Sequence, residues 1–149
     1  MAVANRAGAR LATQHLLDAG QTRIAWGAAL VVEGEFTESG GLRAVEQLRD
    51  ARIEFTAFFA ANDQMAIAAA LALYRRGLRV PDDVSLVGFD DFAPARYAIP
   101  PLTTIRQSVY PLGCQAAVAM LELLHGRTPL VRLPDPELVL RESTRRRLA

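Results

Sequence analysis

The chain has 149 residues, about the size of one domain, and 51% of them are apolar, enough for a hydrophobic core. Its net charge is only +1, with 17 arginines and no lysine, so composition gives no indication of strong attraction to nucleic acid or membrane. The single cysteine, Cys114, excludes a disulfide framework and a thiolate metal site within these residues. No apolar run approaches the roughly 20 residues of a membrane span, and no secretion signal precedes the first helix, so we expect a cytoplasmic protein.

Helix and strand patterns alternate along the chain. Apolar residues at helical spacing, bounded by capping residues such as Asn5 and Ser39, predict helices at residues 5–19, after Ser39, at 64–76 and at 111–125. Short extended runs predict strands at 23–26, 30–36, 56–61, 84–89, 103–107 and 137–141. We expect the arginines at 145–147 to form a frayed tail. The alternation predicts an α/β fold with a mostly parallel sheet flanked by helices.

Two of these strands point to a binding site. The runs 57–61 and 84–89 are short and apolar, are separated by a helix, and each ends in polar residues, as buried parallel strands of a βαβ unit do. Sheets of this kind bind ligands outside the carboxyl ends of their strands. The residues at that position are Asn62, Asp63, Asp90 and Asp91.

Three motifs around these strand ends resemble a known family. Ala-Asn-Asp-Gln-Met-Ala at 61–66, Gly-Leu-Arg-Val-Pro-Asp-Asp-Val-Ser-Leu-Val-Gly-Phe-Asp-Asp at 77–91 and Pro-Pro-Leu-Thr-Thr-Ile-Arg-Gln at 100–107 closely resemble the LacI/GalR family of bacterial transcription regulators. The resemblance extends from about residue 5 to residue 145. It implies a periplasmic-binding-protein-like sensor subdomain whose effector is a sugar or a similar small polar metabolite, without a cofactor.

The resemblance is interrupted between the first two strands. Trp26-Gly27-Ala28-Ala29-Leu30 joins them directly, whereas family members place a loop, an arginine-bearing helix and a further connection there. The family's helix-turn-helix and most of its first sensor subdomain are also missing, so residues 1–149 are interpreted as one partial effector-sensing and dimerisation domain. DNA would be bound only through a helix-turn-helix absent from these residues. A small independent flavodoxin-like domain is the alternative.

Helices 5–19 and 111–125 normally pack in the family's first subdomain. Each carries an apolar face, and leaving such a face in water costs about 25 cal/mol per Å². We therefore expect these helices to find cover, and we expect four side chains on them to be largely buried in whichever assembly exists: Leu11, Leu16, Val118 and Leu121.

The resemblance assigns effector contact to Asn62 and Asp90, and often to Gln107. An amide that both donates and accepts, beside a carboxylate that accepts from two hydroxyls, suits a neutral polyol. We expect Phe92 and Trp26 to add an apolar wall.

Other polar residues are given structural roles. Asp63 occupies a helix N-cap position, and Asp91, next to Asp90 in an extended segment, points the other way and is expected to bond loop backbone. Asp82 and Asp83 are turn residues, and His15 and His125 are ordinary helix residues.

The helix 64–76 is apolar on several sides, and the segment 97–101 is apolar and irregular. In relatives these regions meet a second subunit. We therefore predict a homodimer that uses Ile67, Ala70, Leu71, Tyr74, Tyr97 and Ile99.

The sequence also bears on three other functions. Catalysis is disfavoured because Asp90 and Asp91 diverge, and a pair of Asp63 with Asp90 has no nucleophile, metal cluster or phosphate loop to support it. Direct DNA binding is disfavoured because the only basic cluster, residues 141–147, is a terminal run without a recognition helix. A periplasmic sugar-binding protein would share the fold and is the alternative function.

Overall fold

The computed structural model describes residues 2–25, 35–130 and 134–147. The elements in chain order are α1 (Ala2–Asp18), β1 (Ile24–Ala25), α2 (Glu38–Asp50), β2 (Ala57–Phe59), α3 (Asp63–Arg75), β3 (Ser85–Asp90), the 3-10 helix η1 (Ala93–Arg96), β4 (Thr103–Arg106), α4 (Val109–Leu124) and β5 (Glu137–Val139). The strands form one sheet in the order β1-β2-β3-β4-β5; β1 to β4 are parallel and β5 is antiparallel to β4. The predicted α/β fold with a mostly parallel sheet is confirmed.

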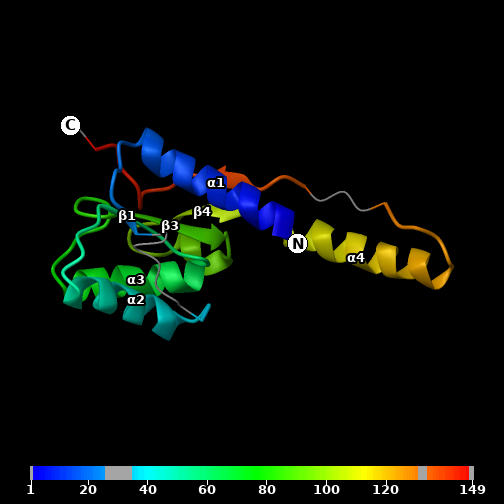
Figure 1. Cartoon of the computed structure of the whole chain (residues 1–149), viewed down its shortest axis with the longest axis horizontal. Helices are drawn as coiled ribbons and strands as arrows, with labels where there is room; N and C mark the ends of the chain where they lie inside the picture. The colour runs from blue at the N-terminus through cyan, green and yellow to red at the C-terminus, as the bar shows by residue number, and fades with distance from the viewer. Residues whose placement is uncertain (1, 26–34, 131–133, 148–149) are drawn as a thin grey trace.

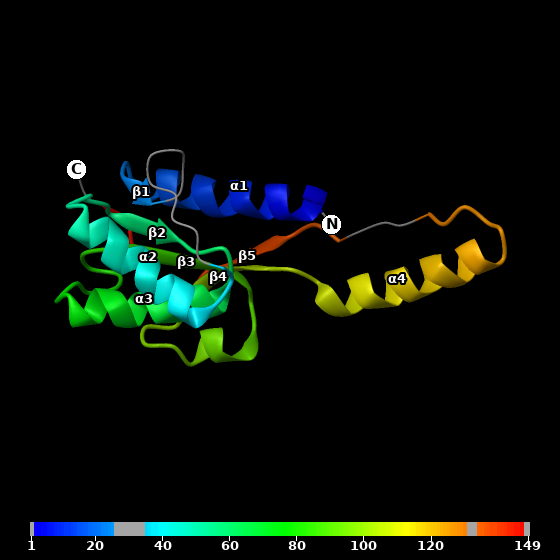
Figure 2. The same cartoon turned by 60° about the horizontal axis from the view of Figure 1, so that its bottom comes forward.

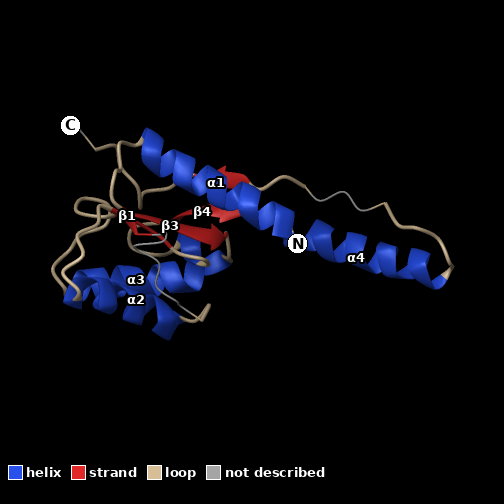
Figure 3. Cartoon of the chain, in the orientation of Figure 1, coloured by secondary structure: helices blue, strands red, loops and turns tan. Residues whose placement is uncertain are grey.

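The sheet lies between two helical layers, with α1 on one face and α2 and α3 on the other (Figures 1 and 3). Alternate side chains of each strand enter opposite layers: Phe58 faces α2 and α3, whereas Phe59 faces α1. Helices α2 and α3 approach closely, since a Cβ added at Gly41 would lie 2.3 Å from the Met65 carbonyl oxygen. Within the described ranges, none of the helices combines the length and apolarity needed to cross a membrane.

Helix α1 packs on this chain's own sheet and so finds the cover expected for it, whereas the resemblance had implied a place in the family's first subdomain. Ala12 and Leu16 are fully buried against Val87, Phe89 and neighbouring strand residues. The helix also begins before Asn5, so Asn5 is not its N-cap. The resemblance implies a different partner for this helix, whereas the spacing of its apolar residues fits the open face of this sheet.

The second helix is capped by Thr37 and not by Ser39. Thr37 is extended, and its hydroxyl accepts a hydrogen bond from Gly40 N at 3.1 Å, which leaves Ser39 inside the first turn. Most of the strand predicted at 30–36 lies outside the described residues; Glu35 and Phe36 lie in a turn.

Helix α4 extends away from the sheet in both views (Figures 1 and 2), and none of its residues is buried. It begins at Val109, so Pro111 lies within its first turn. Of the four side chains predicted to be buried, only Leu16 is; in this single chain Leu11 is 40% exposed, Val118 59% and Leu121 56%. The cover expected for α4 is therefore not supplied by the described residues.

The C-terminal arginines are not a frayed tail up to Arg147. Arg147 N donates to the Ala19 carbonyl at 2.8 Å, and Arg145 N donates to Ser85 Oγ at 3.2 Å. These bonds place the segment beside the end of α1, where it satisfies backbone groups that would otherwise be unpaired.

Candidate functional site

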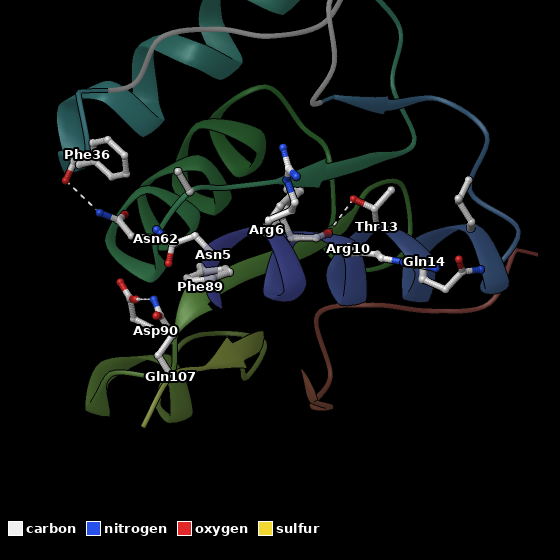
Figure 4. Close-up of a pocket in the computed structure, with 14 residues that line it drawn as sticks. Asn5, Arg6, Arg10, Thr13, Gln14, Phe36, Asn62, Phe89, Asp90 and Gln107 are labelled. Carbon is white, nitrogen blue, oxygen red and sulfur yellow. Dashed lines mark hydrogen bonds between the residues drawn. The ribbon is translucent and has the colours of Figure 1, made fainter. Parts of the chain in front are cut away.

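A pocket of about 700 Å³ opens at the carboxyl edge of the sheet, between the strand ends and α1 (Figure 4). This is where a parallel sheet binds ligands, and the volume is ordinary for a small-molecule site. Three residues predicted to contact effector, Asn62, Asp90 and Gln107, all line it. The other lining residues are Asn5, Arg6, Ala9, Arg10, Thr13, Gln14, Leu17, Phe36, Phe59, Ala61 and Phe89.

Asn62 has a structural task as well as a place in the pocket. Its Oδ1 accepts a hydrogen bond from Met65 N at 2.8 Å, which makes it the N-cap of α3. Its Nδ2 donates to the Phe36 carbonyl at 3.0 Å. The amide is therefore held in one orientation, with limited hydrogen-bonding capacity left for a ligand.

Asp90 and Gln107 meet at one end of the pocket. Gln107 Nε2 donates to Asp90 Oδ1 at 3.0 Å, which leaves the second carboxylate oxygen without a hydrogen bond among the described residues. Burial raises the pKa of Asp90, and the bond from Gln107 partly opposes that shift. Asp90 has a φ of 103°, an unusual conformation for a non-glycine residue at a strand end. The pair offers one carboxylate acceptor and one amide to ligand hydroxyls.

Asp63 is the first residue of α3, and the N-cap is Asn62, so the predicted role of Asp63 as N-cap is wrong. The side chain is 1% exposed, accepts from Thr104 Oγ1 at 2.5 Å and accepts from Phe92 N at 2.9 Å. Burial raises its pKa to about 6, although both hydrogen bonds lower it. A Cβ at Gly88 would lie 2.2 Å from Asp63 Oδ1, so only glycine fits there.

Asp91 points away from the pocket, as predicted, but its partners are arginines and not loop backbone. It accepts from Arg106 Nε at 2.7 Å and from Arg141 Nη2, and its side chain is 2% exposed. Burial alone would raise the pKa of Asp91, but the hydrogen bonds and charges of Arg141 and Arg106 together lower it. The loop after β3 is therefore fixed by an ion-pair cluster.

The apolar wall differs from the prediction. Phe36, Phe59 and Phe89 line the pocket, whereas Phe92 packs against the core on the α2–α3 side. Trp26 lies outside the described residues.

The polar face of α1 was missed as part of the site. Asn5, Arg6, Arg10, Thr13 and Gln14 recur at helical spacing and all line the pocket. Their amphipathic pattern is visible in the sequence, but the helix had been assigned to the wrong subdomain.

The remaining candidates have structural partners. Asp83 accepts from Arg79 N at 2.8 Å, which confirms the turn at 82–83. His15 Nε2 lies 2.9 Å from Thr144 Oγ1, and burial lowers its pKa although Asp18 raises it. Where the structure is described, no group of three His, Cys, Asp or Glu side chains is placed to hold a metal ion.

The residues predicted to form a dimer lie on α3 and just after η1. Leu71 is 43% exposed, Tyr74 77%, Tyr97 82% and Ile99 95%, while Ile67 and Ala70 are partly buried. Their contact with a second subunit remains a prediction.

Comparison with known proteins adds independent findings. Residues 19–144 match the family model described as periplasmic binding protein-like domain. The chain is 39% identical over 117 residues to the HTH-type transcriptional repressor CytR of Escherichia coli (strain K12), which covers 77% of this chain and 34% of CytR. The chain thus spans about a third of that relative.

Solved structures of transcription regulators share the fold. The lac repressor dimer bound to operator and the anti-inducer ONPF is similar with a TM-score of 0.84 and 32% identity, covering 95% of this chain and 59% of that one. The transcriptional regulator CelR in complex with cellobiose gives a TM-score of 0.83 and 31% identity, covering 94% of this chain and 51% of that one.

Proposed function

This chain belongs to the periplasmic binding protein-like domain family, its relatives are LacI-family regulators, and we propose that it is the effector-sensing and dimerisation part of such a regulator. The observation that carries the proposal is the convergence of Asn62, Asp90 and Gln107 on one pocket at the carboxyl edge of the sheet. In this proposal DNA is bound through a helix-turn-helix that is not among the 149 residues, and the regulator acts in the cytoplasm without catalysing a reaction.

The effector is a sugar or a similar small polar metabolite. Asp90 has a carboxylate oxygen free to accept from hydroxyls, Gln107 is held beside it at 3.0 Å, and Phe36 and Phe89 provide apolar surface for a ring face. The complex of the similar regulator CelR with cellobiose supports a sugar as effector. Relatives that are repressors favour this role over that of a periplasmic sugar-binding protein.

Assembly as a homodimer is the second part of the proposal. Tyr74 on α3 and Tyr97 and Ile99 just after η1 are each exposed large side chains, which a second copy would cover. The lac repressor of similar fold is a dimer, which supports assembly as a dimer without naming the surface.

Calorimetric titration of the chain with neutral pentoses and hexoses tests effector binding. We expect weak binding of at least one sugar, and we expect Asp90→Asn to weaken it at least about tenfold because a hydroxyl acceptor is lost. Asp82→Asn removes a carboxylate at the opposite edge of the sheet and should leave the affinity unchanged. Sugar binding that Asp90→Asn leaves intact would refute the assignment of this pocket.

A further inference from the structure

The wall of the pocket formed by α1 carries two arginines that nothing in the described structure neutralises. Arg6 and Arg10 both line the pocket, and neither has a hydrogen bond or ion pair with a described residue. They are separated by one helical turn, where like charges repel and destabilise a helix. The only acidic residue of α1, Asp18, lies two turns beyond Arg10 and is hydrogen-bonded to Gln14.

The opposite end of the pocket has a different character. Both the oxygen and the nitrogen of the Asn62 amide already form hydrogen bonds within the protein, and Gln107 donates to Asp90. What remains there for a ligand is mainly the accepting capacity of the Asp90 carboxylate, the only acidic side chain among the described residues that line the pocket. Figure 4 shows Asn62, Asp90 and Gln107 gathered at one end, while Arg6 and Arg10 follow α1 along its length.

The pocket is therefore polarised along its length. One end accepts hydrogen bonds from hydroxyls, and the α1 wall presents two guanidinium groups, each with several donors suited to carboxylate or phosphate oxygens. A neutral sugar would use the first end and leave the repulsion between Arg6 and Arg10 unrelieved. An anion placed between them would relieve it and would form charge-assisted hydrogen bonds, which are stronger than neutral ones.

We propose that the effector is a hydroxylated anion, whose hydroxyls bind at Asp90 and Gln107 and whose carboxylate or phosphate binds Arg6 and Arg10. This inference rests on the proposed function, because it names the class of effector taken by the same pocket. Sugar acids and sugar phosphates both have the required chemistry, a polyol at one end and an anionic group at the other. The effect of Arg6 and Arg10 is on specificity, since the polyol end is common to neutral and anionic ligands.

Matched pairs of ligands test the proposal on the intact chain. Calorimetry compares glucose with gluconate and glucose 6-phosphate, galactose with galacturonate, and ribose with ribose 5-phosphate. We expect at least one anion to bind about tenfold or more tightly than its neutral partner. That preference should shrink as salt is raised from about 0.05 M to 0.5 M, because ions screen the contact. Comparing the affinities of the sugar acids with those of the sugar phosphates identifies which anionic group the two arginines bind.

Four variants assign the preference to the two arginines. Arg6→Gln and Arg10→Gln should each reduce the preference for the anion over its neutral partner, and the double substitution should abolish that preference. Arg146→Gln is the matched control, because Arg146 is exposed, has no ion pair with a described residue and lies at the opposite edge of the sheet.

The outcomes separate this inference from the function on which it rests. If a neutral sugar binds through Asp90 as tightly as every anion, or if the preference survives the double substitution, the inference is overturned and the proposed function stands. If no neutral or anionic member binds, the proposed function fails, and this inference fails with it.

Discussion

Asp63 Oδ1, one residue after the pocket residue Asn62, accepts a hydrogen bond from Thr104 Oγ1 at 2.5 Å. The other oxygen of Asp63 accepts from Phe92 N at 2.9 Å, so one buried carboxyl group joins the start of α3 to β4 and to the loop after Asp90. The group supports the pocket without lining it.

The pKa of Asp63 makes the stability of the fold pH-dependent. Burial raises the pKa to about 6 in the folded chain, above the value of about 3.9 in an unfolded chain. The folded state therefore binds more protons between those values, so its stability is greatest below pH 4 for this group and falls as the pH rises to 6. We expect the titration of Asp63 to lower the free energy of unfolding by on the order of 2–3 kcal/mol across that window.

Urea unfolding of the wild type and Asp63→Asn at several pH values between 4 and 7 measures this contribution. As the pH rises over this window, the wild type should lose stability relative to Asp63→Asn. Above about pH 6 the difference between the two proteins should level off. Asp90 and His15, which also titrate differently in the folded chain, are common to both proteins and cancel in the difference. A difference that does not vary with pH would show that the carboxyl group is not desolvated.

The ion-pair cluster of Asp91 gives a second prediction. Asp91→Asn leaves the guanidinium of Arg141, 13% exposed, without its charged partner and should destabilise the fold by about 3 kcal/mol. Asp82→Asn removes exposed ion pairs with Arg145 and Arg79 and should cost less than about 1 kcal/mol. If the two substitutions destabilise the fold equally in denaturant unfolding, the buried ion pairs of Asp91 stabilise it no more than the exposed pairs of Asp82 do.

Part of this site was predictable, and the limits of the prediction have physical causes. Periodicity and strand-end polarity placed Asn62 and Asp90 at one edge, because parallel strands end together, and the family resemblance added Gln107; all three line the same pocket. The N-cap was assigned to Asp63 when it is Asn62, since both residue types cap helices and only the extended backbone of Asn62 decides between them.

The partners of Asp91 and the role of α1 depend on contacts distant in sequence. Arg141 reaches Asp91 from 50 residues away, after β5 turns back antiparallel to β4, and no local pattern predicts that return. Helix α1 was recognised as a helix from its spacing, but its partner was inferred from resemblance and was wrong. The packing of α1 on the sheet is what brings Arg6 and Arg10 to the pocket, so the wrong partner for α1 also hid their place in the site.

The double role of Asn62 can be separated by two substitutions. Asn62→Asp keeps an oxygen to accept from Met65 N but cannot donate to the Phe36 carbonyl, whereas Asn62→Ala loses both bonds. We expect Asn62→Ala to cost about 1 kcal/mol more than Asn62→Asp in unfolding experiments, because an N-cap is lost. Both should weaken sugar binding in calorimetry. Equal stability of the two variants would contradict the capping role.

The proposed dimer predicts an effect of charge on its surface. Tyr97→Glu or Ile99→Glu would place a carboxylate in an apolar contact, which costs free energy unless it is paired, so the dimer should dissociate. Light scattering at high micromolar concentration should give a dimer for the wild type and a monomer for either variant. Gln47→Glu adds the same charge to the exposed side of α2 and should leave the dimer intact. A wild-type monomer at that concentration would rule out the proposed surface.

Two leucines on different helices test whether α4 is covered in solution. Leu16 on α1 is fully buried against the sheet, and Leu121 on α4 is 56% exposed in the single chain. We expect Leu16→Ala to cost about 2–5 kcal/mol, because it leaves a cavity, and Leu121→Ala to cost less than about 0.5 kcal/mol. Amide hydrogen exchange should agree: α4 should exchange by local opening, and α1 and α3 only by wider unfolding. A cost above about 2 kcal/mol for Leu121→Ala would show that another part of the assembly buries α4.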